Sequence, residues 1–304
     1  YIARSTSEEK LAEEKKKFDG LYYVNFQFVN MRKDKSQQSE KLGEIPGQTI
    51  LKPKRIEPGW MLVEFDKKEG YVSTSYLQPF LPSFVVRQTG YELPILHYRL
   101  AKEGMIPVLT QHVQRLRADG YTVISMRAFY DLLLRQQQRD ARLDPKTVVL
   151  GVSGVTGNNV KELSDALTAA GVYATLFVQT KDVGLTGITE KMMLTLMANG
   201  YDIQSASHTG DDLRALTNAQ IELELRQGRQ IIEEMTKKNV YAVAYPQGGV
   251  NDRVMEIAAS AGYLIGISST PDRTFTRDQL LRLPSYEIFP TTTADEVVRM
   301  VSGS

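Results

Sequence analysis

The sequence predicts an α/β protein in which a small all-β barrel precedes a larger, irregular (β/α) barrel. Two observations predict this fold class. Residues 21–80 form short β-like runs separated by Gly, Pro and charged turns, whereas residues from Leu93 onward alternate between strand and amphipathic helix patterns. A chain of 304 residues, 42% of them hydrophobic, is long enough to bury more than one core.

Composition excludes several classes of function. The chain has 37 Lys and Arg against 36 Asp and Glu, which gives a net charge of +1. The protein as a whole therefore has no strong positive electrostatic potential that would attract nucleic acid. It has no cysteine, which excludes disulfides, thiolate nucleophiles and cysteine-ligated zinc. No stretch of the sequence approaches the roughly 20 consecutive apolar residues of a membrane span.

The same composition suggests a location. An absence of cysteine fits the bacterial cell envelope, and we expect a periplasmic or extracellular protein. The chain begins at Tyr1 rather than at Met, which is consistent with removal of a signal peptide or a membrane anchor.

Residues 1–20 are predicted to form an N-terminal helix, because STSEEKLAEEKKKF mixes charges on a helix-favouring background. Its few apolar positions indicate a solvated helix, and a partner-binding helix is the alternative.

Residues 21–80 are predicted as the all-β domain, with strands in LYYVNFQFVNMR, QTILKPKRI, WMLVEFD and GYVSTSYL. Residues 81–92 are predicted as a linker, and the two prolines of PFLPSFV favour a stiff connection.

The all-β segment resembles a bacterial SH3-like (SH3b) domain. Three short motifs carry the resemblance in the order of that family: Asn30-Met31-Arg32, Gly59-Trp60, and Gly70-Tyr71-Val72 followed by Ser75-Tyr76-Leu77. The resemblance implies binding of cell-wall peptides or glycans. Trp60, Tyr71 and Tyr76 are therefore candidate residues for stacking on a ligand, and the alternative is that they fill the core of the small barrel.

Residues 93–304 are predicted as the second domain. Its strand-like runs are LPILHY, YTVISM, KTVVLGV, VYATLFV, YDIQSA, VYAVAY and YLIGIS. Amphipathic segments lie between them, and several end in a glycine that is followed at once by a strand: Gly120, Gly171, Gly200 and Gly262. Successive βα units imply a parallel sheet or barrel, with function at the carboxyl ends of the strands.

This second segment resembles the NodB-homology domain of polysaccharide deacetylases. The similarity runs through LPILHY, GVYATLFV, ITEKMMLTLMANGYDI, AYPQGGVND and LRLPSYEI, in the order of that family. The resemblance implies hydrolysis of an N-acetyl group with one divalent metal such as zinc, held by an Asp and two His, beside a second Asp that acts as base. Such a metal lowers the pKa of its water and polarises the amide carbonyl.

The family's metal-binding set is missing from this sequence. Its Thr-Phe-Asp-Asp-Gly motif aligns with residues 151–155, so that Ser153 replaces the base and Gly154 replaces the metal-binding Asp. The two histidines align with Ala206 and Gly210. Because none of these four side chains can coordinate a metal strongly or accept a proton near pH 7, we expect no catalytic residues and no cofactor at this site.

A shifted alignment offers an alternative metal site. It sets His208 on the first family histidine and places Asp212 four residues later, which would give a weak imidazole and carboxylate pair. The chain has three histidines in total. We expect His112 to be a surface or packing residue on its helix, and His97 to be a satisfied core residue of the opening strand, with a place in the pocket at the barrel mouth as the alternative.

Polar residues remain at the expected mouth of the barrel and are candidates for ligand binding: Ser153, Thr156, Asn158, His208, Thr209, Asp211, Tyr245 and Gln247. A catalytic pair of Ser153 and His208 is a further alternative, although the sequence has no nucleophile-elbow pattern. The stretch VVLGVSGVTGNN lacks a P-loop lysine, so we expect a structural loop there rather than a phosphate site.

The sequence thus predicts a catalytically inactive deacetylase-like protein of the cell envelope. Its expected partners are cell-wall glycan or peptide, or another envelope protein, and no nucleic acid. The alternative is an active polysaccharide deacetylase that uses a noncanonical metal site.

Overall fold

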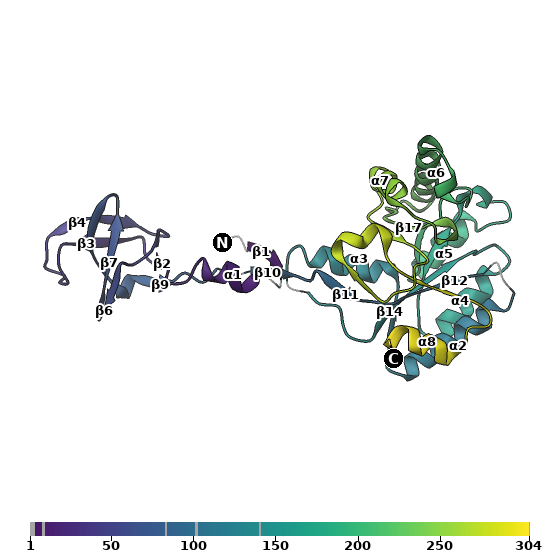
Figure 1. Ribbon diagram of the computed structural model, residues 1–304, viewed down its shortest axis with the longest axis horizontal. Coiled ribbons are helices and arrows are strands. Elements are labelled where there is room, and N and C mark those ends of the chain that lie inside the picture. The colour runs from purple at the N-terminus through teal and green to yellow at the C-terminus, as the bar shows by residue number, and fades with distance from the viewer. Residues whose placement is uncertain (1–3, 8–9, 83, 101–102, 140, 304) are drawn as a thin grey trace. The chain divides into compact units, whose positions relative to one another are not determined.

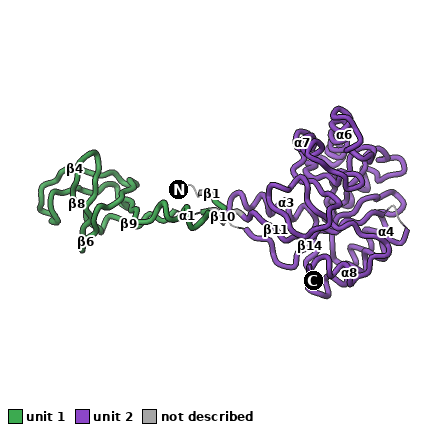
Figure 2. Tube along the Cα trace, in the orientation of Figure 1, with its two compact units in different colours: residues 1–87 green, residues 88–304 purple. Residues whose placement is uncertain are grey.

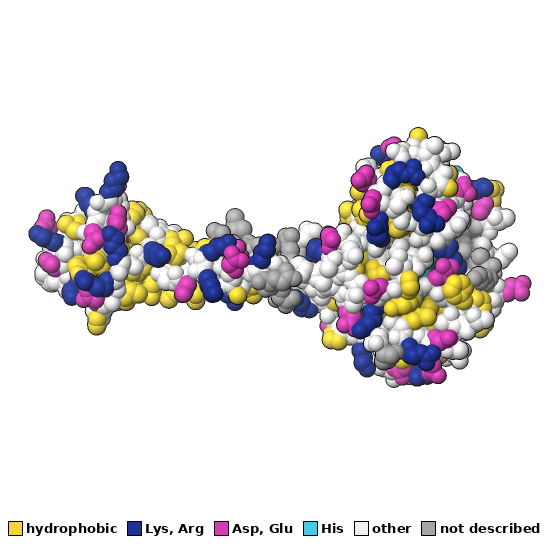
Figure 3. Space-filling view, viewed as in Figure 1, with side chains coloured by type: hydrophobic (Ala, Val, Ile, Leu, Met, Phe, Trp, Pro, Cys, Tyr) yellow, Lys and Arg dark blue, Asp and Glu magenta, His cyan; other side chains and the backbone are white. Residues whose placement is uncertain are grey.

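The computed structural model describes residues 4–7, 10–82, 84–100, 103–139 and 141–303. The chain forms two compact units, residues 1–87 and 88–304 (Figure 2). Acidic and basic side chains are interspersed over the visible face of both units, in keeping with the small net charge (Figure 3).

Unit 1 contains the small β-barrel. One sheet has the order β5-β2-β9 and the other the order β4-β3-β8-β7-β6. The strands are β2 (Tyr22–Val24), β3 (Phe28–Arg32), β4 (Lys41–Pro46), β5 (Ile50–Leu51), β6 (Arg55–Glu57), β7 (Trp60–Phe65), β8 (Lys68–Ser73) and β9 (Leu77–Pro79). Aliphatic side chains fill the space between the sheets, among them Val29, Ile45 and Val63. Alternation of buried and exposed positions along β7 and β8 explains why the sequence predicted strands here.

The prediction of a helix over residues 1–20 was wrong for its first part. Arg4–Ser7 form a strand, β1, that pairs in parallel with β10 (Phe84–Arg87), and only Leu11–Lys16 form a helix, α1. Residues 1–3 and 8–9 of this prediction lie outside the described residues. Backbone pairing with a segment about 80 residues away overrides local helix propensity, because the distant strand supplies the hydrogen-bond partners.

Unit 2 is built on an 8-stranded sheet that curls around a core (Figure 1). All pairings are parallel and run in the order β18-β17-β16-β15-β14-β12-β20, with β13 also paired to β14. A bridge between Ile267 and Leu283 links β18 to the segment that leads into β20, which nearly closes the barrel. The strands are β12 (Ile95–Arg99), β13 (Thr122–Ile124), β14 (Thr147–Ser153), β15 (Thr175–Val178), β16 (Asp202–Ser205), β17 (Ala242–Ala244), β18 (Ile265–Ile267) and β20 (Tyr286–Ile288).

Helices cover the outside of this sheet. They are α2 (Met105–Ala118), α3 (Met126–Arg135), α4 (Val160–Ala169), α5 (Glu190–Ala198), α6 (Asn218–Thr236), α7 (Asp252–Ser260) and α8 (Ala294–Ser302). Figure 1 shows α8 beside α2 and α7 beside α6. Two short strands, β11 (Gly90–Glu92) and β19 (Thr274–Thr276), form a separate antiparallel pair. The fold class predicted from the sequence is confirmed, including every strand named above for this domain.

The four glycines that the sequence placed at the ends of helices have the backbone conformation expected there. Gly120, Gly171, Gly200 and Gly262 all have positive φ, between 65° and 101°. Residues with a Cβ rarely adopt this left-handed conformation, so glycine ends each helix and turns the chain into the next strand.

Two apolar layers hold the domain together. Side chains such as Leu96, Leu109 and Leu163 pack between the sheet and the outer helices. A second cluster, which includes Ile95 and Phe177, packs inside the barrel. The inward positions therefore alternate with outward ones along β12, and this alternation decides which side chains reach the mouth of the barrel.

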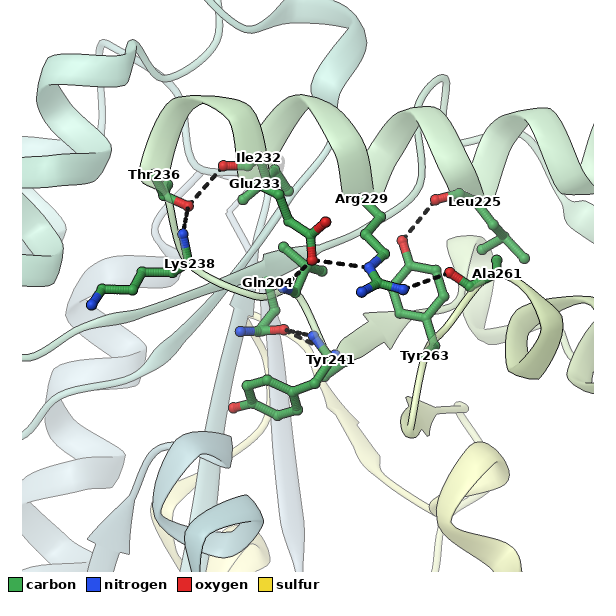
Figure 4. A network of polar contacts seen from close by, with 12 residues as sticks. Gln204, Leu225, Arg229, Ile232, Glu233, Thr236, Lys238, Tyr241, Ala261 and Tyr263 are labelled. Carbon is green, nitrogen blue, oxygen red and sulfur yellow. Dashed lines mark hydrogen bonds and ion pairs between the residues drawn. The ribbon is translucent and has the colours of Figure 1, made fainter.

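Polar contacts fix the C-terminal half of α6 to the strand that follows it (Figure 4). The Glu233 carboxylate accepts hydrogen bonds from Arg229 Nε at 3.0 Å and from the buried backbone N–H of Val240 at 2.9 Å. Arg229 Nη1 donates to the Ala261 carbonyl, and Tyr263 donates to the Leu225 carbonyl. These bonds join α6 to both the start of β17 and the end of α7.

Replacing Glu233 tests this connection. In Glu233→Ala the Val240 N–H loses its partner in a buried place, so the free energy of unfolding should fall by roughly 1–3 kcal/mol. Urea unfolding followed by circular dichroism measures the loss. Glu233→Gln keeps an oxygen acceptor and should lose less than half as much; equal losses in the two variants would contradict a role for this hydrogen bond.

Candidate functional site

The carboxyl ends of the central strands surround a cavity of about 170 Å³. It lies where a parallel α/β barrel places its ligands, at the ends of β12, β14, β15, β16 and β17. The residues that line it are His97, Arg99, Ser153, Gly154, Phe177, Gln179, Ala206, Gly210, Ala244, Tyr245, Pro246 and Gln247. We refer to it as the barrel-mouth cavity.

The four positions that the sequence aligned with the family's metal and base residues come together in this cavity. Ser153, Gly154, Ala206 and Gly210 all line it, although the two pairs are more than 50 residues apart in the chain. Gly154 and Gly210 have φ of 74° and 85°, a left-handed conformation that favours glycine over a residue with a side chain.

A glutamine side chain occupies the space beside Gly210. A Cβ placed on Gly210 would overlap the side-chain amide of Gln179, and Gln179 Nε2 donates a hydrogen bond to the Thr209 carbonyl. A histidine at position 210 could not coexist with this arrangement. The Gln179 side chain therefore occupies the space that a side chain at position 210 would need.

His97 is a pocket residue, and the expectation that it is a satisfied core residue was wrong. Its side chain is only 5% exposed, and its Nε2 has no hydrogen-bond partner among the described residues. Burial, and to a smaller extent the charge of Arg99, lowers the pKa of His97 to about 3. The imidazole is therefore neutral at physiological pH, with its ring edge against Phe177 at a centroid distance of 5.8 Å.

The charged group in the lining is a cation. Arg99 follows His97 on the inward face of β12, and its Nε lies 3.0 Å from the Glu287 carboxylate of β20. Among the described residues, no Asp or Glu lines the cavity.

His208 lies outside this lining. Its Nδ1 is 2.9 Å from Thr180 Oγ1, and its backbone N–H donates to the Glu224 carboxylate. Asp212 is held by the guanidinium of Arg214, whose hydrogen bond lowers the pKa of that carboxyl. His208 therefore does not line the cavity with Ser153, as a catalytic pair would require, and its partners are Thr180 and Glu224 rather than Asp212.

Other predicted residues also lie outside the lining. Thr156 bridges to Gly187, and its backbone N–H donates to Asn159. Thr209 contacts both Asp211 and Glu224 at 2.8 Å, so it stabilises a loop rather than lining the cavity. Asn158 is also absent from the lining. Of the predicted set in this domain, the cavity brings together Ser153, Tyr245 and Gln247, and the Tyr245 hydroxyl donates to the Leu281 carbonyl.

The remaining histidine, His112, packs in the core. It is 1% exposed, with Nδ1 at 3.1 Å from the Tyr98 hydroxyl and Nε2 at 3.0 Å from the Thr292 carbonyl. The structure confirms the packing role.

The donors of the cavity do not fit a divalent metal. Zinc and similar ions are held by several imidazole, thiolate or carboxylate groups. Here one imidazole stands next to a guanidinium, and the other polar side chains carry two hydroxyls, those of Ser153 and Tyr245, and two neutral amides. No group of three His, Asp or Glu side chains with metal-site geometry occurs within the described ranges.

Unit 1 carries a separate aromatic pocket of about 300 Å³. Trp60 and Tyr76 line it together with Phe26 and Phe28, which are 63% and 45% exposed. Tyr71 lies elsewhere, with its hydroxyl accepting from Arg55 Nη2 at 2.8 Å. None of Trp60, Tyr71 and Tyr76 belongs to the aliphatic core of the barrel, so the core-filling alternative was wrong.

Comparison with known families agrees with this architecture. The sequence profile of the polysaccharide deacetylases matches residues 140–266, and that of the bacterial SH3 domain matches residues 28–78. The chain contains a polysaccharide deacetylase-type domain and a bacterial SH3 domain. YxkH from Bacillus subtilis (strain 168), assigned to the polysaccharide deacetylases by its name, is 25% identical over 240 residues, 76% of this chain and 80% of the relative.

Solved structures show the same fold. The Streptococcus pyogenes deacetylase PplD, in complex with acetate, has a TM-score of 0.61 and 20% identity over 70% of this chain and 99% of its own. A polysaccharide deacetylase from Bacillus cereus has a TM-score of 0.59 and 17% identity over 92% of this chain and 90% of its own.

Among the described residues, no helix has the length and apolar character needed to cross a bilayer.

Sequence reasoning missed several lining residues of the deacetylase-type domain, among them Arg99, Phe177 and Gln179. Gln179 directly follows β15, so the rule that singles out Ser153 at the end of β14 also applies to it. Arg99 lies two residues after His97 on one strand, which places both on the same face.

The neutral state of buried His97 predicts a pH dependence of stability. Between its ordinary pKa of 6.5 and its folded value of about 3, the unfolded chain binds a proton that the folded chain does not. The free energy of unfolding should therefore fall by about 1.4 kcal/mol per pH unit as the pH drops through this window. Urea unfolding at pH 7 and pH 5 should show a smaller fall for His97→Leu than for the unmodified chain; identical falls would contradict the burial argument.

Glu224 is predicted to hold the loop beside the cavity. Its buried carboxylate accepts from the backbone N–H groups of His208 and Thr209 at 3.1 and 2.8 Å. Glu224→Ala leaves both donors without a partner and should cost roughly 2–4 kcal/mol of unfolding free energy, with faster amide exchange at the two N–H groups. Glu222→Ala on the exposed face of α6 is the matched control and should change stability by less than about 1 kcal/mol. Equal effects of the two variants would contradict the assignment.

Proposed function

We propose that the protein is a catalytically inactive, deacetylase-like binding protein of the bacterial cell envelope whose ligand is a cell-wall glycan such as peptidoglycan. One observation carries the proposal: Ser153, Gly154, Ala206 and Gly210 meet in the barrel-mouth cavity at the positions where the family resemblance requires the base and the metal ligands.

The chemistry of this set supports binding rather than hydrolysis. A serine hydroxyl does not accept a proton near pH 7, and glycine and alanine have no side-chain atom that coordinates a metal. The neighbouring Arg99 guanidinium opposes a bound cation further. The remaining hydroxyl, amide and imidazole groups form hydrogen bonds with neutral polar ligands.

The choice of a glycan follows from the domain types. The relatives from B. subtilis and B. cereus are named for polysaccharides, and the S. pyogenes protein is named a deacetylase. Both domain types are typical of cell-envelope proteins, which supports the proposed location. Exposed rings in the aromatic pocket of unit 1 suit stacking on a sugar or on a peptide, so we propose this pocket as a second contact to the cell wall.

A binding assay with purified peptidoglycan and with soluble N-acetylglucosamine oligomers tests the proposal. The full chain should bind without added metal, should bind equally in the presence of a chelator, and should release no acetate. Chelator-sensitive release of acetate would instead establish an active deacetylase and overturn the proposal.

Two variants locate the contact. Ala206→Phe fills part of the barrel-mouth cavity and should weaken binding of soluble oligomers by at least about tenfold, equivalent to 1.4 kcal/mol. Trp60→Ala alters only the aromatic pocket and should weaken binding to intact peptidoglycan. Retention of full affinity by both variants would show that neither site binds the glycan.

A further inference from the structure

The part of unit 1 that contains α1, β1 and β10 has little internal support. The helix α1, which is described in full, has six residues and buries none of them. Among the described residues, β1 and β10 pair only with each other. Helices shorter than about 12 residues and isolated two-stranded sheets are marginally stable in water. These elements therefore need further packing to be stable.

An apolar groove of about 630 Å³ lies beside α1, and we refer to it as the α1 groove. Leu81, which is 84% exposed, lines it together with the rings of Phe18, Phe80 and Phe84. Phe18 packs against Phe80 and Phe84 at centroid distances of 5.8 and 6.2 Å, so the rings form a continuous wall. Exposed apolar surface of this kind is typical of interaction sites.

The charges around α1 are complementary to themselves when the segment is read in the opposite direction. Residues 10–19 have the sequence KLAEEKKKFD. When two copies of this segment lie antiparallel about their common midpoint, three kinds of oppositely charged pair result: Glu13 with Lys16, Glu14 with Lys15, and Lys10 with Asp19. A two-fold axis forms each pair twice, because residue i of one copy meets residue j of the other and the reverse also holds.

The pair of Glu13 and Lys16 is available for such a contact. Both side chains are exposed, and neither forms an ion pair within the described part of the chain. Lys16 also lines the α1 groove, so the charged contact and the apolar surface adjoin. Exposed ion pairs contribute at most about 1 kcal/mol each, so they set the register of a contact, while burial of apolar surface supplies most of its affinity.

An anionic bilayer fits this surface less well than a second copy of the chain. Residues 10–19 carry three acidic side chains beside their four lysines. Attraction to an anionic membrane grows with the local excess of basic residues, which is small here. An antiparallel copy instead gives a partner of opposite sign to acidic and basic residues alike.

We propose that α1 and the α1 groove form the interface of a homodimer, in which two copies of α1 lie antiparallel about a two-fold axis. Glu13 of each copy pairs with Lys16 of the other, and the apolar surfaces that include Leu81 cover each other. This inference is independent of the proposed function, since no glycan takes part in the contact.

Sedimentation velocity of the full chain tests the inference. The protein should show a monomer–dimer equilibrium at concentrations up to about 100 µM, since a dissociation constant of micromolar order populates the dimer there. Glu13→Lys and Lys16→Glu each place two pairs of like charges in the interface, and each should raise the dissociation constant at least about fivefold. Leu81→Asp should raise it at least about tenfold, because a charge then replaces buried apolar surface.

Combining Glu13→Lys and Lys16→Glu in one chain sharpens the test. The combined variant exchanges the two charges, restores every opposite pair and should bring the dissociation constant back to within about twofold of the unmodified chain. Glu256→Lys, the same reversal at an exposed helical position in α7, is the matched control and should leave the dissociation constant unchanged. Circular dichroism verifies that each variant is folded.

Each remaining outcome counts against the inference. A monomer at every concentration overturns it, and binding of the same sample to phosphatidylglycerol vesicles would then assign the α1 groove to a lipid surface. A dimer that is insensitive to both single reversals and to Leu81→Asp has its interface elsewhere. A dimer that is weakened by the single reversals and not restored by the combined variant contradicts the antiparallel pairing of Glu13 with Lys16.

Discussion

Parallel strand pairing is the constraint on which the site depends. The ladders that join β12, β14, β15, β16 and β17 hold the carboxyl ends of five strands at one edge. Residues from distant parts of the chain therefore meet there whatever their side chains are. The backbone of this edge does not depend on which side chains it carries, since the hydrogen bonds between strands join backbone groups.

A neighbouring side chain fills the space beside Gly210 in the cavity. The left-handed backbone at Gly210 leaves room that the Gln179 amide fills, and the Thr209 carbonyl fixes that amide in place. Glu224 holds the same loop from the side of α6 by accepting from two of its backbone N–H groups. The loop is thus held by internal polar contacts, and the ionisable side chains among the described lining residues include an imidazole and a guanidinium but no carboxylate.

The two units present two different kinds of surface. Unit 2 offers a small cavity with amide and imidazole groups, which suits one substituent of a ligand. Unit 1 offers a wider pocket with exposed aromatic rings, which suits stacking on a ring of a ligand. Under the proposed function, contacts at both pockets would raise the overall affinity for a polymer, because the second contact forms at a high effective concentration.

The sequence by itself determined the class of the fold and the strands of the parallel sheet, because period-two alternation, amphipathic helices and terminal glycines are local patterns. The replacement of the family's Asp and His at four positions stays a prediction of the motif alignment. The sequence did not determine that β1 pairs with β10, that helices α3 and α8 complete the domain, or that Gln179 occupies the space beside Gly210. Nor did it determine that His97 faces the cavity while His208 bonds to Thr180. Those outcomes depend on which side chains face one another across strands and loops far apart in the chain, and only tertiary packing decides that.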